Sequence, residues 1–553
     1  MDPEATRAVL ANIRVTEAVF KNGSAPALLG TVSGSEAAQR FWLNQLERMQ
    51  PEFGATALAS LHEDLPVNQA FGLLLMWQRI REQYEAGRGA LLAFVFGEGS
   101  RATPLTECEG GQKPAMRSFV MRGVPPQRRA QSIVELALRY FAPVEHYLRK
   151  SGFNGVVVKW GDEIQIPTLP LDGSDPRFAS ADIVRFVSIS RMNEDLAANK
   201  DWVGVDESGN VTAFIPRRPL AQMAALAERG VLQERDDGLY GGINLGSIAV
   251  SDRFLDALLA EFSAEVNDPN ADRKARPDLD PQLFTALTLA TIDDVTERQA
   301  AWEQALSEST AMAKLAESMP DLFGRLRAVI EGFKERHGHG VRIVAMDFGD
   351  QYWGDIGQHR AMFELYTSLL SRDEEGEIAR ALAGLEEQVD ANGNRLAGNT
   401  FIGSGAVVRN SVLIDAKIHS GEVHNSVLIG THCGELHANN AFDVQSTVST
   451  LSLKPRSGSY RVVDRGRCEV AAGERLTTVV LPDEFHHLRV HEDDPLRDRE
   501  RCYDVAIRGN PIAFAKAHEY ALGADLSACE QAREKLESQA RETIDGAFAP
   551  EPT

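Results

Sequence analysis

The stretch LLAFVFGEGSRATPLTECEGGQKP, residues 91–114, joins a short apolar run to a loop of small and cationic residues. The run is too short for a helix and is typical of a buried parallel strand. Ligands bind beyond the carboxyl ends of parallel strands. Glycines in such a loop let backbone N–H groups approach phosphate oxygens, while Arg101 and Lys113 supply positive charge. The stretch therefore predicts a parallel sheet with an anion-binding loop, although the loop alone also fits a structural turn.

The segments that follow alternate between strand and helix patterns. Short apolar runs predict strands at 155–164, 181–189, 202–215 (as a hairpin), 241–250 and 341–348. Such alternation is typical of an α/β domain, which we place at residues 87–375. Three other regions have helical patterns and are interpreted as a helical N-terminal extension (1–86), an insertion (265–335) and a linker helix (376–395).

A short repeat begins after residue 395. The sequence NSVLI occurs at 410–414 and again at 425–429, and Ile402, Val408 and Ile414 are six residues apart. A small repeat with one inward aliphatic residue predicts stacked parallel strands that cover one another's apolar faces. The pattern resembles the hexapeptide-repeat left-handed parallel β-helix, which we place at 396–455; an ordinary sheet with a chance repeat is the alternative. Residues 456–553 give mixed signals and no fold prediction.

Composition limits the classes of partner. The chain has 553 residues, a formal net charge of −22 and five scattered cysteines without a CxxC pair. An acidic chain disfavours broad contact with nucleic acid or anionic lipid, and no apolar run is long enough to span a bilayer. We therefore expect no nucleic-acid partner, no membrane association and a reducing cytoplasmic location. A small anionic ligand is still compatible, because it needs only a few local cations.

The loop resembles a known family motif. Gly97, Gly99, Ser100 and Arg101, followed by Pro104-Leu105-Thr106 and Lys113-Pro114, are similar to GGxGTRLxPLTxxxPKP of the sugar-1-phosphate nucleotidyltransferases (nucleoside diphosphate sugar pyrophosphorylases). Four later elements occur in the family's order, and these are Gly161-Asp162, Pro216–Pro219 in place of "EKP", Gly242–Gly246 for "NxG" and Trp353–Gly357 for "WxDxG". The resemblance covers about residues 90–450. It implies a Rossmann-like nucleotidyltransferase domain, and many members of the family also end in a left-handed β-helix.

The resemblance implies transfer of a nucleotidyl group from a nucleoside triphosphate to a sugar 1-phosphate. Both substrates are anionic, so positioning and electrostatic stabilisation carry the reaction. The implied site has catalytic Arg101 and Lys113, nucleotide-binding Gly97, Gly99, Ser100 and Arg101, sugar-phosphate-binding Arg218 and Asn244, and Asp162 and Asp355 as ligands of Mg²⁺. The terminal repeat implies a homo-oligomer. The base and the sugar are left open.

Each of these residues also has a purely structural interpretation. Asp162 would cap a turn after Gly161, and Asp355 would be the N-cap of the helix that follows. Arg217 and Arg218 would be solvated charges on a hairpin. Asn244 would satisfy backbone groups at a strand end.

The sequence departs from the family motif at several points. Phe96 replaces the first glycine, Glu109–Gln112 lengthens the loop, and Arg217 replaces an acid. In the family, the interval that corresponds to Arg101–Asp162 usually also holds the strand and loop that read the base, and this short interval shows no clear counterpart. These departures motivate an alternative, an inactive scaffold or regulatory protein. A second alternative is a sugar acyltransferase with a general base among the repeat's histidines, His419, His424, His432 and His437.

Overall fold

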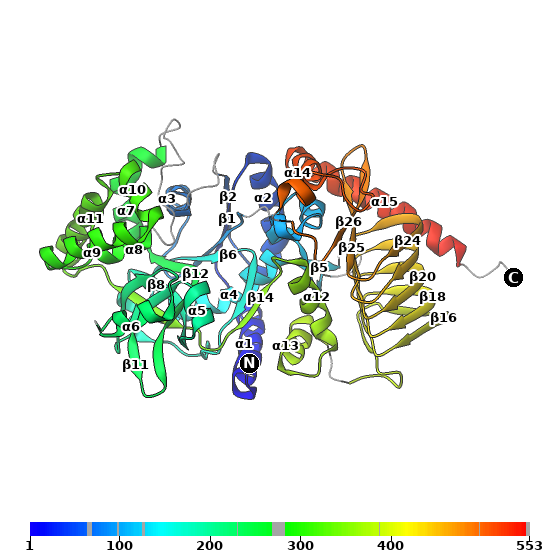
Figure 1. Ribbon diagram of the computed structural model, residues 1–553, viewed down its shortest axis with the longest axis horizontal. Coiled ribbons are helices and arrows are strands. Elements are labelled where there is room, and N and C mark those ends of the chain that lie inside the picture. The colour runs from blue at the N-terminus through cyan, green and yellow to red at the C-terminus, as the bar shows by residue number, and fades with distance from the viewer. Residues whose placement is uncertain are drawn as a thin grey trace.

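A computed structural model describes residues 1–62, 69–96, 99–123, 128–228, 230–267, 283–385, 388–496 and 498–548. Within these ranges, the side chains of Gln69, Ser100, Glu308 and Asp355 are not described. Figure 1 shows two parts side by side, an α/β part that contains the N-terminus and a C-terminal stack of strands along which a long helix runs.

A mixed ten-stranded sheet forms the centre of the α/β part, which confirms the α/β class. Four strands run parallel in the order β2 (Ala57–His62), β1 (Leu28–Ser33), β3 (Ala90–Phe94) and β6 (Gly155–Trp160). The long β12 (Gly238–Ser251) pairs antiparallel with β6 and with β8 (Ile183–Arg191), and β13 (Ile343–Asp347) runs parallel to β8. The remaining strands are β9 (Trp202–Val205), β10 (Val211–Ile215) and β11 (Gln233–Arg235).

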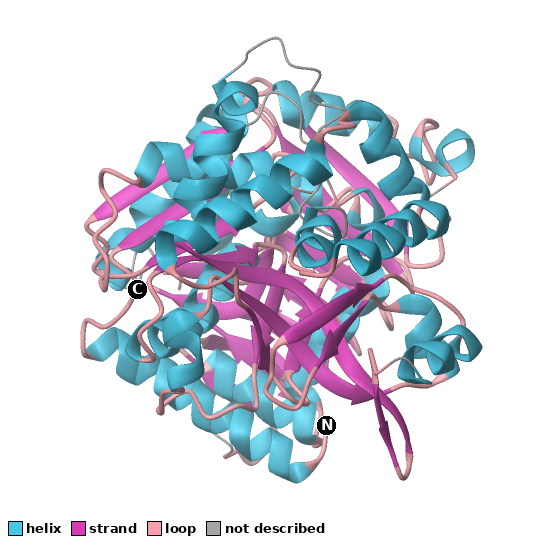
Figure 2. Cartoon of the chain, turned by 90° about the vertical axis from the view of Figure 1, so that its left-hand side faces the viewer, coloured by secondary structure: helices cyan, strands magenta, loops and turns pink. Residues whose placement is uncertain are grey.

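Helices cover both faces of the sheet, as Figure 2 shows. Neighbouring residues of a strand point to opposite faces, so Leu91 and Leu92 of β3 enter different apolar cores. One face packs against α3 (Gln69–Ile80), α7 (Asp252–Asn267), α8 (Phe284–Ala290), α10 (Thr310–Ser318) and α11 (Leu322–His337). The other face packs against α2 (Glu36–Phe53), α4 (Ile133–Lys150), α5 (Glu194–Asn199) and α6 (Leu220–Glu228). Helices α8 to α11, including α9 (Val295–Glu308), occupy the region that was interpreted as a helical insertion.

The N-terminal region differs from its prediction. Residues 1–86 were expected to be a helical extension, but they also contain β1 and β2, which extend the central sheet beyond β3. Helices and strands alternate in this region of the sequence. The helix α1 (Pro3–Lys21) precedes β1, α2 lies between β1 and β2, and α3 follows β2. These strands were not predicted because their sequences, LLGTVS and ALASLH, contain small and polar residues. Such residues interrupt both a continuous apolar run and a regular alternation of apolar and polar residues. The first 86 residues are therefore part of the domain.

Parallel strands form the C-terminal stack. One sheet has the order β15 (Arg395–Ala397), β17 (Val412–Ile414), β19 (Val427–Ile429), β21 (Phe442–Val444), β23 (Gly458–Tyr460) and β25 (Glu474–Val480), closed by antiparallel β26 (Phe485–His491). The second sheet has the order β16 (Phe401–Arg409), β18 (Lys417–His424), β20 (His432–Asn439), β22 (Thr447–Leu453) and β24 (Val463–Val470). The two NSVLI segments are in register, since Val412 pairs with Val427.

The stack differs from its prediction in period and extent. Paired positions such as Val412, Val427 and Phe442 are fifteen residues apart rather than a multiple of six. The chain alternates between a long strand of one sheet and a short strand of the other, so one layer needs fifteen residues. The strands also continue beyond residue 455, the expected end, to β25 and β26.

Several elements join the two parts. The expected linker helix is shorter than 376–395, because α13 (Glu374–Ala383) ends at Gly384 in the left-handed conformation. Two short sheets, β4 (Arg117–Arg122) with β5 (Arg129–Ser132) and β7 (Glu163–Ile166) with β14 (Tyr352–Asp355), lie beside α12 (His359–Thr367). After the stack come α14 (Phe514–Gly523) and α15 (Leu526–Ala547), which runs along it in Figure 1.

Candidate functional site

The predicted anion-binding loop follows β3 and folds into three short helical turns. These are Ser100–Ala102, Thr106–Glu109 and Lys113–Ala115. Gly99 has a φ of +61°, and a Cβ added to it would lie 2.8 Å from the Cβ of Lys113 and 2.9 Å from Cγ2 of Thr106. Only glycine fits this close approach, which brings the start and the end of the loop together.

The loop delivers Lys113 to Asp162. The Lys113 ammonium donates a hydrogen bond to Oδ2 of Asp162 over 2.8 Å, and both side chains are largely buried, with 10% and 19% of their surface exposed. Asp162 follows the end of β6, the strand that pairs in parallel with β3. The sequence prediction thus named two residues, 49 positions apart, that meet at the carboxyl edge of the sheet.

The backbone brings the second predicted acid to the same place. In the antiparallel pair of β7 and β14, Asp355 is the register partner of Glu163, the residue after Asp162. Helix α12 follows β14, and its first residue, His359, donates from Nε2 to the carbonyl of Thr103 in the loop over 2.7 Å. Gln358, rather than Asp355, occupies the N-cap position of this helix.

The structure describes some of the predicted nucleotide-binding residues in full, one only for its backbone and one not at all. Arg101 is exposed and forms no ion pair with another described residue, so its guanidinium is available to an anion. Gly97 lies outside the described residues. Ser100 is described for its backbone, at the start of the first helical turn of the loop.

Phe96, the bulky residue at the family's first glycine position, packs away from the loop. Its ring meets Phe94 edge-to-face with 5.8 Å between centroids, and it lies against the apolar core below α3 and α7. The side chain therefore extends the core at the end of β3.

Asp201 links the backbone of Asn244 to that of Arg217, the residue before the predicted Arg218. The backbone N–H of Asn244 donates to the Asp201 carbonyl over 2.8 Å, and the backbone N–H of Arg217 donates to Asp201 Oδ1 over 3.3 Å. Arg218 is half-buried, whereas the exposed Arg217 pairs with the Asp201 carboxylate. The side-chain oxygen of Asn244 accepts from Arg185 and also from the backbone N–H of Gly246 over 3.2 Å, and the second bond is the one that its structural interpretation describes.

A β-bulge connects this group to the loop edge. The register of β12 against β8 shifts between Asn244 and Ile248, and Gly246 within the bulge has a φ of +74°. A Cβ at Gly246 would lie 3.2 Å from the indole nitrogen of Trp160, two residues before Asp162. Bulges of this kind often re-aim side chains next to active sites.

Lys159 is a residue of this region that the sequence reasoning missed. It is fully buried at the end of β6, and its ammonium has no hydrogen-bond partner among the described residues. Burial lowers its pKa, while the charges of Glu163 and Asp162 oppose that shift. The sequence signal was a single charged residue inside GVVVKW, an otherwise apolar strand.

Polar side chains also line the same edge at the neighbouring strands. Ser33 and His62 end β1 and β2 in matching register, and Gln39 of α2 hydrogen-bonds to both His62 and the Ser60 carbonyl. Their position follows from the parallel pairing of β2, β1, β3 and β6, whose carboxyl ends share one edge. These groups stand beside the loop, although they precede it in the chain.

The histidines of the stack are engaged in other contacts. Oδ1 of Asp545, on α15, lies 2.9 Å from Nε2 of His432, 3.3 Å from Nε2 of His419 and 2.6 Å from the ammonium of Lys417. The ring of His419 also stacks on Phe548. The geometry fastens α15 to β18 and β20 and covers the two histidines.

The remaining two stack histidines pair with acids on their own strands. Nε2 of His437 lies 3.0 Å from Glu435, and Nε2 of His424 lies 3.9 Å from Glu422. No feature of these contacts favours an acyltransferase.

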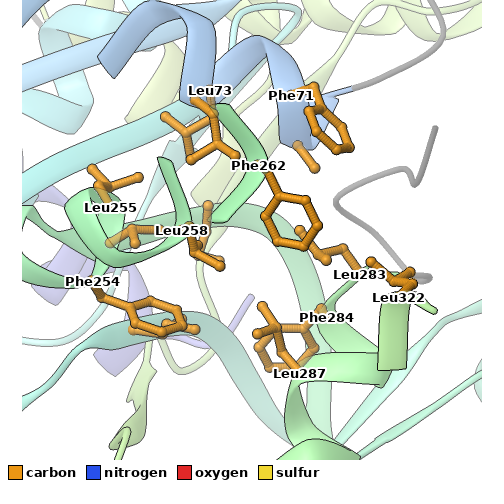
Figure 3. A pocket seen from close by; sticks show the side chains of 15 residues that line it. Phe71, Leu73, Phe254, Leu255, Leu258, Phe262, Leu283, Phe284, Leu287 and Leu322 are labelled. Carbon is orange, nitrogen blue, oxygen red and sulfur yellow. The ribbon is translucent and has the colours of Figure 1, made fainter. Parts of the chain in front are cut away.

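An apolar cavity of about 30 Å³ lies on the face of the sheet that packs against α3, α7 and α8. The described residues that line it are all apolar and include Phe71, Leu258 and Phe284 (Figure 3). The cavity does not include the residues of the loop after β3.

Comparisons with known proteins leave the family open. The sequence matches no protein-family model, and it has no significant match among curated proteins. None of the described helices has both the length and the apolar character needed to cross a bilayer.

Proposed function

We propose that this chain transfers a nucleotidyl group from a nucleoside triphosphate to a sugar 1-phosphate and releases pyrophosphate. The observation that carries the proposal is the 2.8 Å contact between Lys113 and Asp162 at the carboxyl edge of a parallel sheet, in a loop that also exposes Arg101. Cations and a carboxylate at such an edge suit two phosphorylated substrates.

The chain's own residues would act mainly by binding and orientation. Arg101 would neutralise the triphosphate and the leaving pyrophosphate, and Lys113 would hold the α-phosphate. An oxygen of the sugar phosphate would then form a bond to the α-phosphorus while the bond from that phosphorus to the β-phosphate oxygen breaks. No proton transfer is required, so the rate depends on alignment and charge neutralisation.

A magnesium ion fits the donor set at this edge. Asp162 already accepts a cationic group on Oδ2, and its side chain keeps a partly exposed surface beside the loop. Hard carboxylate oxygens together with substrate phosphates are what Mg²⁺ prefers, and Asp355 would add a second carboxylate next to Glu163. When bound, the ion would supply positive charge to the reacting phosphates.

The strands β1 and β2 offer a place for the nucleotide base. The sequence shows no clear counterpart of the base-reading strand between Arg101 and Asp162, but two parallel strands from the first 62 residues extend the sheet from β3, with β1 beside β3 and β2 beside β1. We infer that the base lies against their carboxyl ends, near Ser33 and His62. In this interpretation, β1 and β2 would take the place of the family's base-reading strand, although they come from an earlier part of the chain. Arg218 and Asn244 would face the sugar phosphate.

For the stack, we propose a left-handed parallel β-helix that joins copies of the chain. The first strands of its two sheets expose Leu396, Phe401 and Val407, each between 44% and 47% exposed. Exposed apolar groups at an open sheet end favour self-association. We expect an oligomer in light scattering, and Phe401→Asp to shift it toward monomer; a wild-type monomer would contradict this assignment.

The five cysteines are all free thiols, which agrees with the proposed cytoplasmic location.

The proposed reaction is tested by product formation. The wild-type chain is incubated with Mg²⁺, four nucleoside triphosphates and a panel of sugar 1-phosphates, and the products are identified by mass spectrometry. We expect one nucleoside diphosphate sugar together with an equal amount of pyrophosphate. A folded protein that forms neither product from any pair supports the inactive scaffold instead.

A further inference from the structure

The proposed reaction leaves one segment of the loop unexplained, Glu107–Gln112, which includes the residues Glu109–Gln112 that lengthen the loop. In the structure, this segment meets the C-terminal part of the chain. Its partners come from β23, α14 and α15, more than 340 residues later in the sequence.

Glu109 is the centre of this contact. Its carboxylate lies 3.3 Å from two nitrogens of Arg117, 2.8 Å from Nη1 of Arg461 and 2.8 Å from the hydroxyl of Tyr460. The same hydroxyl accepts a hydrogen bond from the backbone N–H of Arg117 over 2.7 Å. The network is buried, since Glu109, Arg117, Tyr460 and Arg461 are each at most 5% exposed.

Helix α15 extends this network. Arg461 also pairs with Glu530 over 3.2 Å, and Arg533 donates to the Arg461 carbonyl over 2.7 Å. The charge of Arg461 holds the pKa of Glu530 far below its ordinary value. Burial lowers the pKa of Arg461, but the charges of Glu109 and of other acids nearby together more than offset this effect, so the pKa of Arg461 is raised. Buried charges with several partners fix one geometry, and removing one partner leaves the other charge uncompensated.

The neighbouring residues provide a second contact. Glu107 is buried and lies 3.1 Å from Nδ1 of His518 on α14. Gly110 has a φ of +67°, and a Cβ there would lie 2.4 Å from Cδ2 of Leu526, the first residue of α15. The glycine lets the start of α15 approach the loop backbone.

We propose that Glu107–Gln112 is a docking segment through which β23, α14 and α15 position Arg101 and Lys113 on the triphosphate. Glu109 and Arg461 are thereby positioning residues rather than catalytic residues. This inference rests on the proposed function for its ligand, but the docking itself concerns the loop alone. It makes the C-terminal region a structural part of the phosphate site, and it accounts for the departure of the loop from the family motif.

The test uses the full chain and a ligand that does not depend on the base, magnesium pyrophosphate. Binding is measured by calorimetry, and backbone order in the loop by hydrogen exchange of peptides from 99–122. We compare wild type with Arg461→Met, Glu109→Gln and the double variant. The double variant removes one positive and one negative charge, so the network that also holds Arg117 and Glu530 keeps its net charge, whereas each single variant leaves an unbalanced buried charge.

We expect faster exchange of the loop and at least tenfold weaker pyrophosphate binding in the double variant. Arg461→Lys should recover part of both, since it keeps the charge but not the fork of donors. The control is Lys454→Met, which breaks an exposed ion pair with Glu469 on the same stack and should change neither readout.

The two possible failures can be told apart. Loop exchange and binding in the double variant equal to those of wild type would overturn the docking inference. A wild type that binds no pyrophosphate, with loop exchange still faster in the variants, would contradict the proposed function instead.

Discussion

At the scale of residues, the contact between Lys113 and Asp162 is the centre of the account. A loop lysine and a carboxylate from the neighbouring strand meet over 2.8 Å, where a phosphate and a divalent cation would both find opposite charge. Lys159 adds a second, buried cation to the same strand end.

Asp162→Asn should therefore lower turnover by about 100-fold or more, because the amide loses the charge that would hold the metal ion and Lys113. Pyrophosphate release at saturating Mg²⁺ measures this loss. The matched control is Asp172→Asn at an exposed position ten residues later, which should leave the rate unchanged. Full activity in Asp162→Asn would remove the residue from the site.

His359 links the loop to pH. Burial and the nearby charge of Arg475 lower its pKa to about 4, and the neutral ring donates to the carbonyl of Thr103. The unfolded chain takes up a proton near pH 6.5, which the folded chain resists. The lowered pKa of His359 therefore stabilises the folded chain fully above pH 6.5. This contribution to the free energy of unfolding, about 3 kcal/mol, is lost as the pH falls toward 4.

Replacing His359 with Gln tests this assignment, because Gln can donate to Thr103 but cannot titrate. Urea unfolding at pH 7 and pH 4.5 should show a smaller loss of unfolding free energy in the variant than in wild type. Equal losses in the two proteins would show that His359 does not sense pH.

At the scale of elements, the strands β1 and β2 join the first 86 residues, which were expected to form a helical extension, to the α/β part. Both belong to the central sheet, and Leu29 of β1 is fully buried in the core beneath α2 and α4. The N-terminal segment therefore has to fold together with the rest of the α/β part.

Leu29→Ala should lower the free energy of unfolding by roughly 2–5 kcal/mol, because it leaves a cavity in that core. The control, Val295→Ala, shortens an aliphatic side chain at a position that is 68% exposed and should cost less than about 0.5 kcal/mol. Denaturant unfolding gives both values, and similar small losses would mean that the N-terminal segment is a loosely attached extension after all.

The elements show which signals the sequence carried. Continuous apolar runs such as LLAF and VVV predicted β3 and β6, and the alternation with helices predicted the α/β class. Strands β1 and β2 were missed because glycine, serine and histidine interrupt their apolar pattern. The fifteen-residue layer of the stack was already present in the spacing of the two NSVLI segments, whereas the six-residue spacing of Ile402, Val408 and Ile414 does not report how the chain alternates between two sheets.

The candidate site was predictable where motif order reflects strand order. Lys113 and Asp162 follow adjacent strands, so their approach could be inferred from the sequence. The partners of Glu109 could not, since Arg461 and Glu530 become neighbours of the loop only through the packing of the stack and α15.

At the scale of the whole molecule, one apolar core joins the two parts. It combines residues of α4, α12 and α13 with the short strands of the stack, and the ring of Phe442 lies 4.8 Å from that of Tyr366. All six tryptophans belong to the α/β part, between Trp42 and Trp353. Tryptophan fluorescence therefore reports on the α/β part alone.

A substitution in the stack should thus be felt in the α/β part. Phe442→Ala should lower the melting temperature seen by tryptophan fluorescence and by far-UV circular dichroism equally, because the shared core is lost in one cooperative transition. An unchanged fluorescence transition beside a shifted circular dichroism transition would show that the two parts unfold independently.

A crystal structure of the full chain grown with Mg²⁺ and pyrophosphate tests the proposed phosphate site most directly. We expect pyrophosphate oxygens within hydrogen-bond distance of Arg101 and Lys113, and the ion on the Asp162 carboxylate with Asp355 beside it. Pyrophosphate bound elsewhere, or an Asp355 carboxylate turned away from Asp162, would contradict this expectation.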